Sequence, residues 1–87
     1  MRVFIATMCP PRLGGNRTIG QLYIDDYNNR MRSLAASEGA VLVDIYAGLL
    51  PDVTRYIGVD GLHPTEAGYA KIADIFFQSI QANFEVR

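Results

Sequence analysis

A buried strand is predicted over Ala40-Val41-Leu42-Val43-Asp44-Ile45, a short apolar run rich in β-branched residues. Gly39 stands directly before this run, where a helix that ends in a left-handed residue places a glycine. A second apolar, β-branched run lies at residues 3–7 and is ended by Pro10-Pro11, so it also predicts a buried strand. Because a helical pattern separates the two apolar strands, the order predicts a right-handed parallel βαβ unit.

Two amphipathic helices are predicted from residues that recur at helical spacing. The first runs from about residue 19 to residue 38, and its predicted apolar face consists of Tyr23, Tyr27, Met31, Leu34 and Ala35. The second begins with Pro64 in the first helical position and runs to about Ala82. Its predicted apolar stripe consists of Tyr69, Ile72, Ala73, Phe76, Phe77 and Ile80. Residues 46–57 show no clear pattern, and the tyrosines at positions 23, 27 and 69 are expected in the core.

Length and charge restrict the class of protein. Eighty-seven residues make one small domain or a piece of a larger one, and rule out a two-domain enzyme. With 8 Lys and Arg against 9 Asp and Glu, no basic surface is predicted, and we expect no nucleic-acid partner. One cysteine and one histidine give no metal-binding spacing, so no metal or other cofactor is predicted. No signal peptide or membrane span is predicted, and the compartment stays undetermined.

The single histidine, His63, follows Asp60 by three residues in a turn that leads into the last helix. A carboxylate at this spacing can curl back to accept the Nδ1–H of the imidazole and fix its tautomer. Nε2 is then free to act as a base. Gly61 favours the tight turn that brings the two side chains together.

The run Asp60-Gly61-Leu62-His63-Pro64-Thr65 resembles the Asp-x-x-His-Pro block of the SGNH (GDSL-type) serine hydrolases. Residues 27–32, 42–44 and 56–57 are similar to the last third of that family. The resemblance implies an α/β fold, of which residues 1–87 form the C-terminal βαβα portion of a flavodoxin-like parallel-sheet domain. It also implies that Asp60 and His63 are two members of a Ser-His-Asp triad and that the substrate of the whole enzyme is an ester.

The nucleophile half of this family pattern is missing from the chain. The three serines, Ser33, Ser37 and Ser79, all fall in predicted helices and none follows a Gly-Asp pair. The pair Gly15-Asn16 lies in a loop after the first strand and lacks the following Asp, so it is not assigned to the oxyanion hole. We therefore predict that the isolated chain is close to inactive on esters.

Other interpretations of the same residues stay open. His63 can be a helix cap whose ring binds a carbonyl, and Asp60 an ordinary turn residue. Asp44 and Asp52 are expected as cap or turn residues. Cys9 is either a small buried hydrophobe or, less simply, a substitute nucleophile.

A second hypothesis is that the chain is a non-catalytic remnant of the family that functions by binding. In this hypothesis the chain binds a partner, or a second copy of itself, through the exposed edge of the strand at residues 3–7. Arg12 and Arg17 belong to a surface loop between about residues 10 and 20, and either line a pocket in a full enzyme or are simply solvated.

Overall fold

A computed structural model describes residues 2–84 of the chain. Its strands are β1 (Phe4–Ala6) and β2 (Val41–Val43), and its long helices are α1 (Gln21–Glu38) and α4 (Glu66–Phe84). Between β2 and α4 the chain forms α2 (Ile45–Leu49), the 3-10 turn η1 (Leu50–Asp52) and α3 (Val53–Tyr56). The segment at 46–57, for which no element was predicted, is therefore mostly helical turns.

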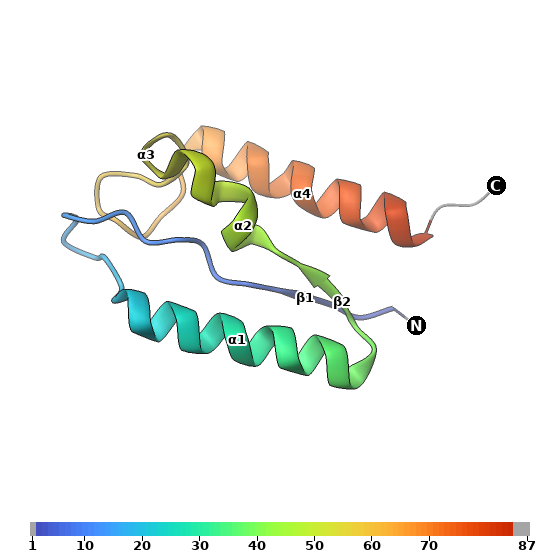
Figure 1. Ribbon diagram of the computed structural model, residues 1–87. Helices are drawn as coiled ribbons and strands as arrows, with labels where there is room; N and C mark the ends of the chain where they lie inside the picture. The colour runs from blue at the N-terminus through green and yellow to red at the C-terminus, as the bar shows by residue number, and fades with distance from the viewer. Residues whose placement is uncertain (1, 85–87) are drawn as a thin grey trace.

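The two strands are parallel and α1 connects them. Phe4 lies opposite Val41, and Ala6 lies opposite Val43. α1 packs on both strands, whereas α4 packs on β2, α2 and α3. Figure 1 shows the strands between α1 on one face and α2 and α4 on the other. The predicted α/β class with parallel strands is confirmed.

The hydrophobic core lies between the sheet and α4. It centres on Val43, Ile45, Leu49 and Ile57, which are almost fully buried and form one cluster. Each such aliphatic side chain contributes about 1.5–3 kcal/mol when fully buried. Partly buried neighbours complete the core: Phe4, Ala6, Cys9, Val53, Tyr56, Ile72, Ile75 and Phe76. Because Ile57 directly precedes the loop that carries Asp60 and His63, the core fixes the base of that loop.

The predicted apolar face of α1 is only partly correct, since Ala35 is buried and Met31 half-buried, but the rest of the face is shifted by one position. The helix buries Ile24, Asn28 and Ala35, while Tyr23, Tyr27 and Leu34 are exposed. The side-chain amide of Asn28 explains the difference, since its Oδ1 accepts a hydrogen bond from Met8 N at 2.7 Å. A polar residue on the buried face is invisible to a search for apolar spacing.

The start and the stripe of α4 also differ from prediction. The helix begins at Glu66 rather than Pro64, because the Thr65 hydroxyl accepts a hydrogen bond from Gly68 N at 3.1 Å and caps the first turn. Pro64 instead forms an isolated antiparallel bridge with Ile57. Of the predicted stripe, Ile72 and Phe76 pack against the core, as does Ile75, which lay outside the prediction. The other four members of the stripe are exposed, namely Tyr69, Ala73, Phe77 and Ile80.

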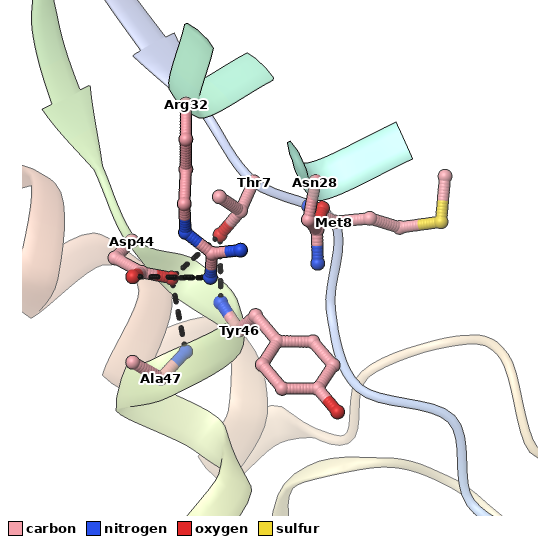
Figure 2. Close-up of polar contacts among 7 residues, drawn as sticks. All are labelled: Thr7, Met8, Asn28, Arg32, Asp44, Tyr46 and Ala47. Atoms are coloured by element: carbon pink, nitrogen blue, oxygen red, sulfur yellow. Dashed lines mark hydrogen bonds and ion pairs between the residues drawn. The ribbon is translucent and has the colours of Figure 1, made fainter. Parts of the chain in front are cut away.

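A polar cluster joins the carboxyl ends of the two strands, as Figure 2 shows. The buried Thr7 hydroxyl, just after β1, donates to Asp44 Oδ1 at 3.0 Å and accepts from Tyr46 N at 2.9 Å. Asp44, just after β2, also accepts from Ala47 N at 3.1 Å and caps α2. The Arg32 guanidinium of α1 lies 3.4 Å from both Asp44 oxygens. The expected role of Asp44 as a cap residue is confirmed.

Candidate functional site

Asp60 and His63 lie in the site loop, residues 58–63, between α3 and α4. His63 Nδ1 is 2.6 Å from Asp60 Oδ2. The other carboxylate oxygen, Oδ1, accepts hydrogen bonds from Leu62 N at 2.9 Å and from His63 N at 3.0 Å. The residues singled out from the sequence therefore meet in one hydrogen-bonded pair.

The backbone of the site loop is closed by its own short-range hydrogen bonds. Gly58 N donates to His63 O at 2.7 Å, and Gly61 N donates to Gly58 O at 3.0 Å. Gly61 has a φ of 86°, in the left-handed region that glycine adopts without strain. At the two ends of the loop, Thr65 N donates to Tyr56 O at 2.8 Å, beside the bridge between Ile57 and Pro64. The tight turn expected at Gly61 is confirmed.

The charge on Asp60 fixes the protonation pattern of the pair. The hydrogen bond from His63 Nδ1, together with the N–H groups of Leu62 and His63, holds the pKa of the Asp60 carboxyl well below its usual range. An ionised carboxylate only accepts hydrogen bonds, so Nδ1 of a neutral His63 carries the proton and Nε2 presents a lone pair. The His63 side chain is 61% exposed and that of Asp60 29%. The imidazole is therefore exposed to solvent, while the carboxylate behind it is mostly covered.

The remaining candidates from the sequence lie elsewhere. Cys9 packs against the core cluster, and burial raises the pKa of its thiol, so it has the character of a small hydrophobe. Asp52 is exposed at the end of η1. The serines lie in the long helices, Ser33 and Ser37 in α1 and Ser79 in α4, as predicted.

Gly15 and Arg12 were named from the sequence, but their contacts with the Asp60 segment were not predicted. Gly15 lies so close to the Asp60-Gly61 peptide that a Cβ there would overlap Asp60 O and Gly61 N. The half-buried Arg12 side chain also binds the protein, since its Nη1 donates to Ile57 O at 3.0 Å. Both residues contact backbone atoms, and because every residue has a backbone carbonyl, such a contact cannot be recognised from the sequence.

Within residues 2–84, no three His, Cys, Asp or Glu side chains gather as a metal ion would require. In the same part of the chain, none of the helices combines the length and the apolar character needed to cross a membrane.

A model of the GDSL-like Lipase/Acylhydrolase family matches residues 1–71. The chain belongs to this family. The part of the chain that matches contains both strands, α1 and the site loop. No curated protein matches the sequence.

Among solved structures, this GDSL-family chain is similar to the esterase domain of the ORF1 protein of the zebrafish ZfL2-1 retrotransposon. The two share 15% sequence identity and superimpose with a TM-score of 0.76. The match covers 93% of this chain and 49% of the zebrafish chain. The GDSL-family chain thus reproduces part of an SGNH esterase fold and spans about half the length of that relative.

Proposed function

We propose that residues 1–87 are the C-terminal segment of a GDSL-type ester hydrolase domain and supply the Asp-His half of its Ser-His-Asp triad. The observation that carries the proposal is the hydrogen bond of 2.6 Å between Asp60 Oδ2 and the exposed imidazole of His63. The family match supplies the class of substrate, an ester of unspecified acid and alcohol.

In the proposed mechanism, His63 moves a proton twice. Nε2 takes the proton from a serine hydroxyl of the upstream half as the serine oxygen bonds to the ester carbonyl carbon. The resulting imidazolium is stabilised by the Asp60 carboxylate, and it gives the proton to the leaving alcohol as the C–O bond breaks. Water then attacks the acyl-enzyme by the same route, giving the acid and restoring the serine.

The proposal predicts different activities for the chain alone and for a completed domain. The purified chain should hydrolyse a p-nitrophenyl short-chain ester no faster than its His63→Ala variant, because no activated nucleophile is present. A fusion that places the upstream half of a GDSL-family esterase before residue 1 should hydrolyse the ester, and His63→Ala should lower its kcat by about 10⁴-fold or more. Rapid His63-dependent turnover by the chain alone would contradict the proposal, and so would a fusion whose esterase activity does not depend on His63.

The extent of the domain has its own test, which does not depend on folding of the fusion. The transcript should carry an open reading frame upstream of codon 1 that encodes a Gly-Asp-Ser block. An in-frame stop codon directly before codon 1 would overturn the proposal that this segment completes a longer domain.

A further inference from the structure

We infer that the loop of residues 10–18 is a clamp that positions the Asp60–His63 pair, with Arg12 and Gly15 as its positioning residues. The inference rests on the proposed function, because it explains how that pair is held in a reactive geometry. This clamp follows β1, more than forty residues before Asp60 in the chain, and contacts the site loop mainly through backbone groups.

The clamp binds both carbonyl groups of the Asp60-Gly61 segment. Arg17 N donates to Asp60 O at 2.8 Å, and Arg12 N donates to Gly61 O at 3.2 Å. The Asp60 side chain meanwhile accepts from Leu62 N and from His63. Asp60 is thus held by its backbone from one loop and by its carboxylate from the other.

Glycines allow the two loops to come into direct contact. A Cβ on Gly15 would overlap the carbonyl group of Asp60 and the nitrogen of Gly61. A Cβ on Gly61 would overlap Thr18 Oγ1 and lie 2.6 Å from Arg12 O. These neighbours are mainly backbone atoms, which cannot move aside as the end of a flexible side chain does. The contact surface therefore requires a glycine on each side.

Thr18 gives the clamp its shape. Its hydroxyl donates to Arg12 O at 2.6 Å and accepts from Gly15 N at 3.1 Å. One side chain thereby fixes the two clamp residues relative to each other. The hydroxyl thus ties the loop together at the point where it faces Gly61.

The Arg12 side chain extends the clamp to the base of the site loop. Its Nη1 donates at 3.0 Å to the carbonyl oxygen of Ile57, which caps α3, and lies 3.4 Å from Thr54 O within α3. Arg12 therefore contacts both ends of the segment that carries Asp60, through its side chain at Ile57 and through its backbone at Gly61. A shift of the Asp60 backbone by about 1 Å is enough to weaken the bond to His63 and to cost about 10²-fold in rate.

The test compares Gly15→Ala with Gly20→Ala in the full 87-residue chain. A Cβ on Gly20 meets open space, and the backbone there has a φ of −60°, so Gly20→Ala is a matched control. In the native chain and in Gly20→Ala, NMR should show a downfield, exchange-protected Nδ1–H signal of His63. In Gly15→Ala that signal should be lost, and the titration of the Asp60 carboxyl carbon should move up towards the ordinary aspartate range.

Arg12→Met and Arg12→Lys provide a second pair of variants if Gly15→Ala does not fold. Arg12→Met removes the hydrogen bonds to Ile57 O and Thr54 O and should weaken the Nδ1–H signal, and Arg12→Lys, which keeps one donor, should restore part of it. In the fusion enzyme, Gly15→Ala and Arg12→Met should each lower kcat by about 10²-fold and leave KM little changed. Folded Gly15→Ala and Arg12→Met chains that keep the native signal would overturn the clamp. If the signal responds as expected but His63→Ala leaves the fusion fully active, the clamp stands and the proposed function fails.

Discussion

The two oxygens of the Asp60 carboxylate have different tasks. Oδ1 accepts the N–H groups of Leu62 and His63 and so closes the turn, whereas Oδ2 accepts Nδ1–H and orients the ring. Because the turn and the ring depend on the same side chain, the position of the imidazole is set by the local backbone. The carboxylate thus orients the ring within the site loop, and the clamp of residues 10–18 holds the Asp60 backbone from which it does so.

Asp60→Asn is expected to preserve the turn and abolish the function of the pair. The amide oxygen still accepts the two backbone N–H groups, but its NH₂ group faces Nδ1 and donates. A neutral His63 then carries its proton on Nε2 and cannot take a proton from serine. In the fusion enzyme, kcat should fall by about 10⁴-fold with an unchanged circular dichroism spectrum. Asp52→Asn, which removes an exposed carboxylate, is the control, and equal activities of the two variants would argue against the tautomer role.

The contacts of the Asp44 carboxylate should make the folded chain less stable in acid. Partial burial alone raises the pKa of this carboxyl, but the N–H of Ala47, the hydroxyl of Thr7 and the Arg32 guanidinium together bring the pKa below its ordinary value. Since the folded pKa is the lower one, the stabilisation is present above the unfolded value of about 3.9 and is lost as the pH falls through the folded value.

Urea unfolding at several pH values between about 7 and about 2 tests this sign. The unfolding midpoint of Asp44→Asn should be lower than that of the native chain at neutral pH, and it should fall less on acidification. Asp52→Asn controls for the change in net charge. If the urea midpoints of Asp44→Asn and of the native chain change with pH in parallel, this carboxylate does not contribute to the pH dependence of stability.

At the scale of elements, α1 is held to the sheet by a buried amide as well as by apolar contacts. Asn28 is 2% exposed and its Oδ1 accepts Met8 N just after β1. Asn28→Ala leaves that backbone donor without its acceptor and should lower the free energy of unfolding by about 1–3 kcal/mol. Asn29→Ala, on the exposed side of the same helix, should change it by less than about 0.5 kcal/mol. Equal urea midpoints for the two variants would show that the Asn28 bond adds nothing.

The elements were predictable wherever the signal lay in side-chain spacing. The strands around residues 5 and 42, both long helices and the Asp60–His63 pair all follow from local patterns. The orientation of α1 could not be predicted, because its buried face contains Asn28 and leaves Tyr23 exposed. The 10–18 loop was not assigned a role either, since Arg12 and Gly15 contact carbonyl groups that any sequence provides.

At the scale of the whole molecule, the described residues expose many large apolar side chains. The most exposed examples are Leu22 at 84%, Leu13 at 83%, Val59 at 80%, Tyr23 at 62% and Phe77 at 62%. The similar zebrafish esterase domain is about twice as long as this chain, and the match covers 49% of it. Under the proposed function, part of this apolar surface is covered by the upstream half in the complete domain and is exposed in the isolated chain.

We therefore expect the isolated chain to associate with further copies of itself through apolar surface that includes the exposed side of α1. Light scattering after size exclusion should give a mass above the 9.6 kDa of one chain, rising with protein concentration. Leu22→Glu combined with Tyr23→Glu places charge on that surface and should shift the equilibrium towards the monomer, whereas Ser37→Glu, exposed on the same helix, should not. In the fusion, the added half should raise the melting temperature and reduce self-association, because it buries part of the same apolar area. A chain that stays monomeric at every concentration and melts cooperatively would show instead that the segment is stable without a partner.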